Sequence, residues 1–479
     1  MSRWARASGL VLGTALIASG CAGAPSMVPQ RTELPPSPPA ISPPAIQSFH
    51  TPFFPSARTP IPQATDGVAP APTARAVRLT PAAGEQIPPP ADPIPFGQQV
   101  TNVLLLGSDR RAGNEFRDDV LILVSLDPVG KQAVVLSIPR DLWVYLPGQG
   151  MQRINTSFGI GENRDYPGGG MGLLRDSIQY NLGIPVDRYV RVEMQGFEDL
   201  VDALGGVEVL VACSYTDWRL KSPEAPPEKQ DSWELFTVPT GPVAMDGAQA
   251  LWYSRARARS SDFDRSRRQQ EVLRAVYRHL RDTNLVTRIP SMFQTLSRHA
   301  STDLTLNDLL NLAPLAADIG PASVRSRFIG REQVEDFRVP TSGAAVLVPK
   351  PDALRALLER TFSDEAWSMA GSLDGVQVEV VDASRQPGWV ELAAERLAYA
   401  GVPTFSGSSA EPSDGPTLLL ELQPGNDSAV QALLQVLGLD DSRVRAAPEP
   451  AARARFRLIV ADDYNPCFDP TRRQSASDG

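Results

Sequence analysis

Acidic and basic side chains gather in three short segments, Gly107-Ser108-Asp109-Arg110-Arg111, Arg117-Asp118-Asp119 and Pro139-Arg140-Asp141. Two carboxylates that are held close together repel each other unless a cation lies between them. Oxygen ligands in small number suit Mg²⁺, or Mn²⁺, whose remaining positions are taken by water and substrate phosphate. The residue types therefore point to a metal-assisted phosphate site, with Asp109, Asp119 and Arg140 at its centre. Charged residues in solvated loops stay open as the alternative for any one of them.

The elements that would position these side chains are three short apolar runs at 103–106, 120–126 and 133–138. They are rich in β-branched residues and bounded by Gly, Asp and Pro, which predicts strands. If consecutive strands are antiparallel, the end of the first, the start of the second and the end of the third share one edge. Asp109, Asp119 and Arg140 are then expected to converge.

A second cluster lies further along the chain, at 253–257 and 262–270. An extended conformation would place Arg255 and Arg257 on one face. The segment from Asp262 opens a helical pattern, in which Arg265, Arg268 and Gln269 are neighbours at i, i+3 and i+4. Several arginines that face one spot favour a bound pyrophosphate, because each guanidinium donates to phosphate oxygens two at a time.

An exposed basic helix face is the open alternative for this second cluster. Nucleic acid is a weaker interpretation, because the net charge is -9 and no basic stripe with interleaved aromatic residues accompanies the arginines. A zinc hydrolase and a nucleotide-driven enzyme are disfavoured as well. The three histidines, His50, His279 and His299, have no metal-binding spacing, and the sequence contains no GxxxxGK[ST] loop.

Taken in order, these motifs resemble the LytR-CpsA-Psr (LCP) family. The resemblance covers about residues 98–365 and includes Gly107 to Arg111, Arg117 to Asp119, Ser137 to Asp141, Arg153 to Asn155, Asp202 to Val209, Met245 to Leu251 and Tyr253 to Gln270. It implies an α/β fold, an α-β-α sandwich around a mixed central sheet. It also implies an extracytoplasmic transferase that moves a glycopolymer from a polyprenyl-pyrophosphate carrier to peptidoglycan, forming a phosphodiester with the help of Mg²⁺.

The resemblance also assigns roles to individual residues. It implies that Asp109 and Asp119 bind the metal and that Arg140 and Arg257 act with them in catalysis. The residues that it places on the pyrophosphate are Arg117, Arg140, Arg255, Arg257, Arg265 and Arg268, with Gln269 at a matching motif position.

Three aspartates near these motifs keep alternative interpretations. Asp141 and Asp264 either touch the metal or orient an arginine. Asp118 departs from the family, in which Ser or Ala is commoner, and either crowds the metal or faces solvent. Two other functions stay open for the whole set of motifs, a pyrophosphatase that hydrolyses lipid carriers and a non-catalytic protein that binds wall polymer or regulates envelope genes.

Apolar residues of two helical patterns form a further candidate feature, a slot for the lipid carrier. They are Leu173, Leu174, Ile178 and Leu182, followed by Phe197, Leu200, Val201 and Leu204. Amphipathic helices usually pack on their own sheet, which favours a plain core. Only the family resemblance favours the slot.

The N-terminal region predicts export. A basic segment at 2–6, an apolar segment at 10–17 and Ala18-Ser19-Gly20-Cys21 resemble a bacterial lipoprotein signal over residues 1–21, with lipidation at Cys21. We therefore expect an extracytoplasmic protein anchored to the membrane by lipid. A cleaved signal with an incidental cysteine is the alternative. Residues 22–97 are expected to form a disordered spacer, since 20 of the 45 prolines lie between Ala22 and Phe96.

The C-terminal part predicts a second, smaller α/β domain over 374–464. Strand patterns at 376–382, 417–422 and 456–461 alternate with helical patterns at 389–400 and 429–437. The order resembles the LytR C-terminal domain, for which wall or partner binding is a hypothesis. Residues 465–479 are expected to be a disordered tail. Cys213 and Cys467 form either a disulfide, which an exported setting permits, or free thiols.

Overall fold

The structure is a computed structural model. It describes residues 87–467, apart from 97–98, 111–115, 223–224, 284–291, 294–297, 363–372 and 374. The predicted signal, the lipidation at Cys21, most of the predicted spacer and the tail beyond Cys467 lie outside the described residues.

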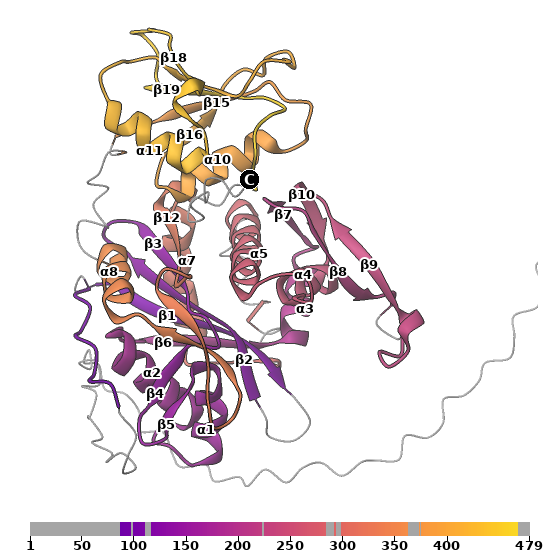
Figure 1. The fold of residues 1–479 in the computed structure, drawn as a ribbon, viewed down its shortest axis with the longest axis vertical. Coiled ribbons are helices and arrows are strands. Elements are labelled where there is room, and N and C mark those ends of the chain that lie inside the picture. Colours follow the sequence, from indigo (N-terminus) through magenta and orange to yellow (C-terminus); the bar gives the residue numbers. More distant parts are fainter. Residues whose placement is uncertain are drawn as a thin grey trace, which may run out of the picture. The chain divides into compact units, whose positions relative to one another are not determined.

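A six-stranded sheet forms the centre of the larger domain (Figure 1), with the strand order β11-β6-β1-β2-β3-β12. The strands are β1 (Thr101–Arg110), β2 (Phe116–Asp127), β3 (Gln132–Ser137), β6 (Arg188–Glu193), β11 (Ala300–Thr302) and β12 (Val324–Phe328). The pairs β1–β2 and β2–β3 are antiparallel, which is the arrangement assumed in expecting Asp109, Asp119 and Arg140 to converge. The pairs β1–β6 and β3–β12 are parallel, so the sheet is mixed.

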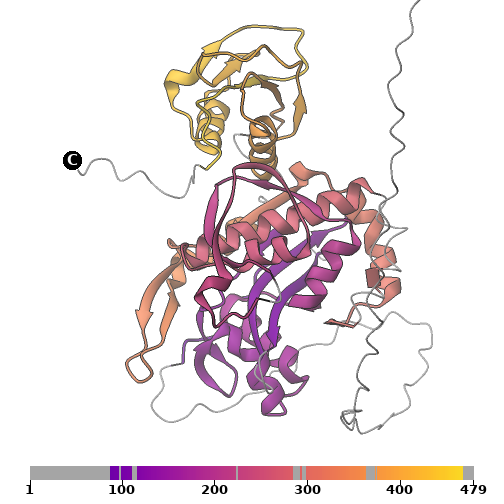
Figure 2. The ribbon, with the colours of Figure 1, turned by 90° about the vertical axis from the view of Figure 1, so that its right-hand side faces the viewer.

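Helices cover both faces of this sheet. On one face, α2 (Gly169–Leu182) buries Leu174 and Ile178 against Leu104 and Leu123. On the other, α5 (Asp262–Asp282) and α7 (Leu306–Asp318) pack Leu273 and Leu315 with Ile122 and Val135. Figure 2 shows α5, in pink, crossing in front of the purple strands. The alternation of inward residues along each strand thus produces the predicted α-β-α sandwich.

The apolar residues of α2 are plain core. Leu173, Leu174, Ile178 and Leu182 are all buried in the same cluster as the sheet. The interpretation of this helix as core, rather than as a lipid slot, is therefore confirmed.

A smaller lobe of the same domain has its own core, which includes Val201, Val209 and Tyr253. It consists of α3 (Met194–Ala203), β7 (Val207–Val211), β8 (Tyr215–Leu220), β9 (Trp233–Val238), β10 (Gly241–Met245) and α4 (Gly247–Arg255). The backbone of Gly247 lies against that of Glu198, because a Cβ added there would be 2.4 Å from the Glu198 carbonyl oxygen. The Gly247 amide also donates to Asp202 at 2.7 Å. Two of the recognised motifs, at 202–209 and 245–251, therefore join α3 to α4.

The remaining elements of the larger domain surround the sheet. They are β4 (Trp143–Leu146), β5 (Gly150–Arg153), α1 (Ser157–Asn163), β13 (Val334–Arg338), β14 (Ala345–Pro349) and α8 (Pro351–Phe362). The residues just before β1 belong to this domain too. Ile94 is buried in its core, and its amide donates to the Gly183 carbonyl at 2.9 Å. The end of the expected spacer, residues 87–96, is thus packed on the folded domain.

The C-terminal domain is a five-stranded sheet with two helices. The sequence predicted both helices and three of the strands, and the short strands at 404–406 and 444–446 were not predicted. Its strand order is β16-β15-β19-β17-β18. The elements are β15 (Val378–Asp382), α10 (Trp389–Tyr399), β16 (Thr404–Ser406), β17 (Leu418–Glu421), α11 (Asp427–Leu437), β18 (Val444–Ala446) and β19 (Phe456–Val460). A disulfide joins Cys213 to Cys467. Of the two states considered for these cysteines, the structure therefore has the disulfide.

The lengths and compositions of the helices show whether any of them could span a membrane. Among the described residues, no helix is both long enough and apolar enough to cross a bilayer.

Candidate active site

A β-bulge shapes the strand end at which the predicted carboxylates lie. Gly107 pairs with Val120, but the next residue, Ser108, pairs with Asp118, so Asp119 is the extra residue on β2. Bulges of this kind change the direction of a side chain and are common beside active sites. Asp119 accepts a hydrogen bond from Arg140 at 2.6 Å. The sequence-predicted pair of Asp119 and Arg140 is therefore brought together.

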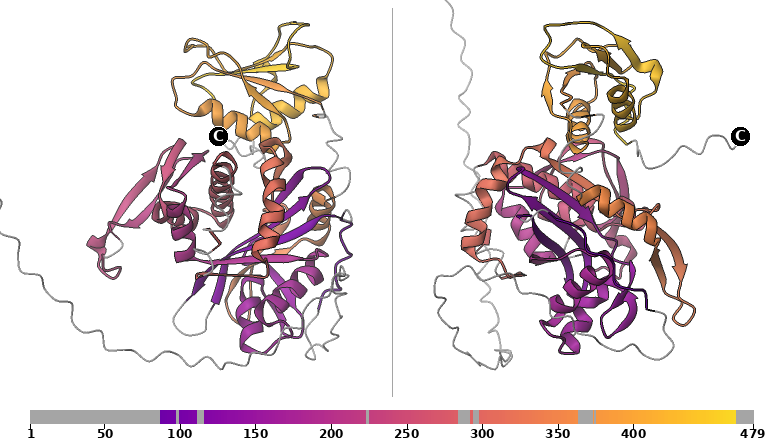
Figure 3. Two further views of the ribbon diagram at one scale, coloured as in Figure 1. Left: turned by 180° about the vertical axis from the view of Figure 1, so that it is seen from behind. Right: turned by 90° about the vertical axis from the view of Figure 1, so that its left-hand side faces the viewer.

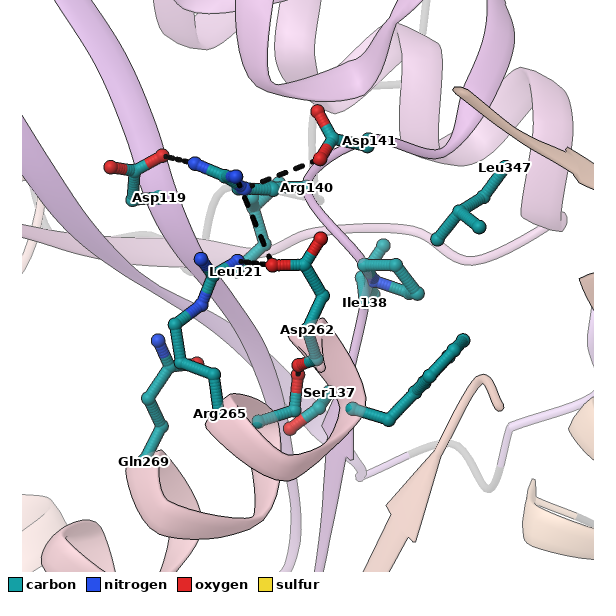
Figure 4. A pocket seen from close by; sticks show the side chains of 13 residues that line it. Asp119, Leu121, Ser137, Ile138, Arg140, Asp141, Asp262, Arg265, Gln269 and Leu347 are labelled. Atoms are coloured by element: carbon teal, nitrogen blue, oxygen red, sulfur yellow. Dashed lines mark hydrogen bonds and ion pairs between the residues drawn. The ribbon is translucent and has the colours of Figure 1, made fainter. Parts of the chain in front are cut away.

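Arg140 is surrounded by three carboxylates (Figure 4). Besides Asp119, its guanidinium lies 3.4 Å from Asp141 and 3.8 Å from Asp262. Burial lowers the pKa of Arg140, but the hydrogen bond and charge of Asp119, together with the charges of Asp141 and Asp262, outweigh it, so the pKa is raised overall. Arg140 is therefore held cationic and fixed in direction.

The loop that carries Arg140 is fixed by a second motif. The Asn155 amide donates to the Arg140 carbonyl at 3.2 Å. Arg153 lies 3.4 Å from Asp141. Asp141 thus lies between Arg140 and Arg153, and of its two interpretations this contact fits the one in which it orients an arginine.

The first turn of α5 supplies the other side of the site. Ser261 and Asp264 form a capping box, which fixes where the helix begins. Arg265, which is 5% exposed, lies 2.9 Å from Asp262. Burial, and then the positive charge of Arg140, lower the pKa of Arg265. Two guanidiniums thus lie close enough to repel each other, with Asp262 between them.

Gln270 ties this helix to the sheet. Its side-chain amide donates to Ser137 at 2.8 Å and to the Arg327 carbonyl at 3.1 Å. Because Ser137 ends β3 just before the Arg140 loop, the contact fixes the distance between the two arginine-bearing segments.

A pocket of about 350 Å³, part of it open to solvent, lies between β2, the Arg140 loop and the start of α5. One side is polar and the other is apolar, with Leu121, Ile138, Phe263 and Leu347. The full lining is Asp119, Leu121, Ser137, Ile138, Pro139, Arg140, Asp141, Asp262, Phe263, Arg265, Ser266, Gln269 and Leu347.

The segment at 253–257 differs from the extended conformation that we expected. Tyr253 to Arg255 are the last residues of α4, because the helix continues until Arg255. Arg255 nevertheless lies 3.6 Å from Asp109. Arg257 follows in an exposed loop. Arg117 is opposite Asp109 in the pairing of β1 with β2. The position of its side chain is not described.

Arg268 and Gln269 bind the end of α4. Arg268 is fully buried, and its guanidinium donates to the carbonyls of Tyr253 and Ala256. It also lies 3.9 Å from the centre of the Tyr215 ring. Gln269 donates to the Ser254 carbonyl at 3.2 Å and lines the pocket. Arg268 thus holds the turn that leads to Arg257 and is not among the residues that line the pocket.

Asp118 neither faces solvent nor crowds the site, so both expectations for it are corrected. It is 1% exposed and accepts a hydrogen bond from Arg191 at 3.0 Å. Arg191 also donates to Ser108 and lies 4.0 Å from the centre of the Phe158 ring. Burial raises the pKa of Asp118 to about 6, although the charge of Arg191 opposes this. Asp118 therefore belongs to a buried ion pair under the sheet end.

Several residues of the site were not predicted from the sequence. Asp262, Gln270 and Arg191 lack a motif that distinguishes them from ordinary surface residues. The only available signal was the position of Asp262 and Gln270 at the two ends of the arginine-rich segment. No local sequence signal marked Arg191, because its partner Asp118 is 73 residues away in sequence.

A divalent cation fits these residues in part. Within the described ranges, no group of three or more His, Cys, Asp or Glu side chains is arranged to hold a metal. Asp109 and Asp119 are each partly exposed at the sheet end, with side chains 21% and 25% exposed. Two carboxylates suit Mg²⁺, which takes its other ligands from water and phosphate.

Comparison with known proteins places the chain in a family. The LytR_cpsA_psr family matches residues 90–359, which is more than half of the chain. The chain belongs to this family. The LytR-CpsA-Psr match begins near the packed segment at 87–96 and ends in α8.

Its relatives include named transferases. The chain is 31% identical over 217 residues to the polyisoprenyl-teichoic acid–peptidoglycan teichoic acid transferase TagU of Oceanobacillus iheyensis, covering 45% of this chain and 62% of that one. It is 26% identical over 269 residues to the regulatory protein MsrR of Staphylococcus aureus, covering 55% and 74%. The match thus covers less than two thirds of the TagU length.

Solved structures of two further proteins are similar. Bacillus subtilis TagV is 23% identical with a TM-score of 0.46, covering 57% of this chain and 98% of TagV. TagT bound to LI-WTA is 28% identical with a TM-score of 0.42, covering 55% and 89%.

Proposed function

We propose that this LytR-CpsA-Psr protein is an extracytoplasmic transferase that moves a glycopolymer from a polyprenyl-pyrophosphate carrier to peptidoglycan. The observation that supports it best is the cluster of Arg140 and Arg265 with Asp119 and Asp262 at the wall of one pocket. Guanidiniums in a half-buried pocket suit a pyrophosphate. The names of the TagU relatives give the same reaction class.

The pyrophosphate binds between the strand end and the start of α5. Arg140 and Arg265 contact its oxygens, and they exchange part of their contact with Asp119 and Asp262 for contact with phosphate. Arg255, the last residue of α4, and Arg257, in the loop that follows, add further positive charge. Phosphate bound there relieves the repulsion between Arg140 and Arg265, because its negative charge lies between them.

The reaction is a single displacement at phosphorus. A sugar hydroxyl of peptidoglycan attacks the phosphorus nearest the glycan, and the bond from that phosphorus to the bridging oxygen breaks. Polyprenyl phosphate leaves with the bond electrons, and a phosphodiester forms. The arginines stabilise the charge on the phosphoryl oxygens, a contribution that is typically about 3 to 4 kcal/mol for one donor acting in the transition state.

Asp109 and Asp119 would hold Mg²⁺ or Mn²⁺, which when bound supplies further positive charge to the phosphoryl oxygens. Arg140 forms an ion pair with Asp119, and Arg255 forms one with Asp109.

The proposed location is outside the cytoplasm, with a lipid on Cys21 as the membrane anchor. The disulfide between Cys213 and Cys467 supports it, because disulfides persist in oxidising compartments. Metabolic labelling with a clickable fatty acid tests the anchor. We expect label on the wild type and none on Cys21→Ser, and a wild type without label would contradict lipidation.

The transferase test uses the purified full chain with Mg²⁺, a synthetic polyprenyl-pyrophosphate glycan and peptidoglycan fragments. Mass spectrometry follows the phosphodiester-linked product. We expect product that disappears with EDTA and in Asp109→Asn or Asp119→Asn. Asp336→Asn, which changes an exposed carboxylate on β13, is the matched control and should keep full activity.

Other outcomes separate the alternative functions. Cleavage of the carrier without linkage to peptidoglycan would favour a pyrophosphatase. No turnover with several donors and acceptors, together with binding to wall polymer, would favour a non-catalytic wall-binding or regulatory protein.

A further inference from the structure

The two-stranded ribbon of β8 and β9 has an unusual distribution of apolar residues. Trp218 pairs directly with Leu235, and Leu220 pairs with Trp233. Side chains at every second position share a face, so these four residues lie on one face of the ribbon. Trp218 is 48% exposed and Leu235 is 50% exposed. The face therefore presents two large apolar side chains to solvent.

The opposite face carries the charges. Arg219 and Glu234 form an ion pair at 2.8 Å on that side, and the guanidinium of Arg219 lies over the Phe236 ring. Phe236 packs against Trp252 of α4. A ribbon in water usually has its apolar residues inward and its charges outward. Here the inner face buries Tyr215 and Val238 near the base and carries the partly exposed Arg219–Glu234 pair further out, while the other face carries apolar residues and no charge along the strands.

The outer face continues without charge to the base of the ribbon. Its third cross-strand pair is Thr216 and Thr237, whose hydroxyls are 2.7 Å apart. Figures 1 and 3 show the ribbon extending away from α3 and α4. On this face Trp218 and Leu235 are about half exposed, whereas Trp233 is partly buried and its indole donates to the Pro227 carbonyl at 2.9 Å. Trp218 and Leu235 are thus the part of this face that can meet a surface outside the chain.

The base of the ribbon is bonded to the candidate active site. Asp217 of β8 accepts a hydrogen bond from the Ala258 amide at 2.9 Å, immediately after Arg257. It also accepts one from the Tyr215 hydroxyl, and the Tyr215 ring lies under the Arg268 guanidinium. Whatever binds the outer face is therefore held close to the loop that carries Arg257.

We propose that this face, formed by Trp218, Leu220, Trp233 and Leu235, inserts into the surface of a lipid bilayer. Tryptophan and leucine suit the boundary between headgroups and acyl chains, where an amphipathic indole is favoured. The inference rests on the proposed function, because a donor that is held in a membrane must present its pyrophosphate at the bilayer surface.

The size of the face favours a bilayer over a protein partner. A ribbon of six residues and two strands offers roughly 200 Å², from about 3.3 Å per residue and about 5 Å per strand. A stable protein interface needs about 800 Å² on each partner. A bilayer needs no matching shape, and the predicted lipid on Cys21 would keep one within reach. A lipid anchor and an apolar surface patch together give firmer attachment than either alone.

Vesicle binding tests the proposal with the full chain in a Cys21→Ser background, so that no lipid is attached. The probe is phosphatidylcholine vesicles with and without phosphatidylglycerol, followed by flotation. We expect Trp218→Thr/Leu235→Thr to bind at least about tenfold more weakly, because two large apolar side chains no longer leave water. Threonine keeps the preference for strand, so the ribbon should stay folded.

Phe337→Thr is the matched control, since Phe337 is 46% exposed on another ribbon, β13 and β14. It should leave vesicle binding unchanged. Equal binding by all variants, or no binding by the parent chain, would overturn the proposal. A change in oligomeric state of the double variant, with vesicle binding unchanged, would assign the face to a second copy instead.

A paired activity assay separates this proposal from the proposed function. With a vesicle-borne donor, Trp218→Thr/Leu235→Thr should transfer more slowly than the parent, and with a short-chain, water-soluble donor it should match the parent. An equal loss with both donors would mean that the ribbon acts on the site itself. No transfer with either donor by the parent chain, combined with vesicle binding that depends on Trp218, would refute the transferase and retain the membrane surface.

Discussion

The arginines of the candidate site differ in what their guanidiniums contact. Arg140 and Arg265 lie among carboxylates at the pocket wall. Arg257 is exposed, and its charge contributes to lowering the pKa of Arg265. Arg268 contacts backbone carbonyls instead. A spacing of three and four residues on a helix groups Arg265, Arg268 and Gln269 on one side but does not say which of them reaches the ligand. The contacts therefore separate the arginines that line or approach the pocket from Arg268, although all of them were predicted to bind pyrophosphate.

Replacement of Arg257 tests a residue that acts on the ligand. Arg257→Ala should lower kcat/KM by about 10² to 10³, which is typical for one donor that acts in the transition state. The unfolding midpoint should not change, because the side chain is exposed. Arg259→Ala, an exposed arginine in the same loop, is the matched control and should keep activity. Equal effects of the two replacements would indicate a general electrostatic role for the loop.

Replacement of Arg268 tests a residue that acts on the fold. Arg268→Met should destabilise the protein by about 1 to 3 kcal/mol, since it leaves the buried carbonyls of Tyr253 and Ala256 without donors. Arg268→Lys should recover little, because an ammonium lacks the planar fork that reaches both carbonyls. Urea unfolding measures both. Full stability with lost activity would instead support the predicted contact between Arg268 and pyrophosphate.

At the scale of elements, the strand patterns predicted the arrangement well. The positions of β1, β2 and β3, the start of α5, and three strands and both helices of the C-terminal domain follow from local periodicity and capping residues. The antiparallel pairing of β1 to β3 was assumed, and the short strands β16 and β18 were not predicted. The bulge at Asp119 and the helical end at Tyr253 to Arg255 were not predicted. Both depend on contacts with distant segments, such as the bonds from Arg268 to the end of α4. Local pattern carries no information about such contacts.

The pair of Asp118 and Arg191 joins β2 to β6 across β1, and it is expected to be costly to break. Asp118→Ala should destabilise the protein by about 3 to 5 kcal/mol, because it leaves a buried guanidinium without its partner. Asp118→Ala/Arg191→Met should be less destabilised than the single variant, because the unpaired charge is gone. Urea unfolding of both variants measures this. Additive effects of the two replacements would show that the pair contributes no coupling.

At the scale of the whole molecule, α5 links the site to the C-terminal domain. Its first turns carry Arg265 and Gln269, and further along it Arg274 lies 3.6 Å from Glu395 of α10. The guanidinium of Arg274 also lies 3.9 Å from the centre of the Tyr399 ring. Together with the disulfide, these contacts make the C-terminal domain a support for the helix that forms one wall of the pocket. The sequence patterns did not predict these contacts between the two domains, and they left open whether Cys213 and Cys467 form a disulfide.

The disulfide should therefore contribute to stability more than a local crosslink would. Cys213 and Cys467 are 254 residues apart, and closing a long loop lowers the entropy of the unfolded chain. We expect Cys213→Ser/Cys467→Ser to cost about 2 to 5 kcal/mol in guanidinium unfolding, the range for native disulfides. Reduction with dithiothreitol should destabilise the parent by a similar amount and leave the double variant unchanged. Cys21→Ser in both proteins removes the third thiol. If the reduced parent keeps its full stability, the contacts of Arg274 with Glu395 and Tyr399 hold the domain without the crosslink, and Glu395→Gln should then be the more damaging change.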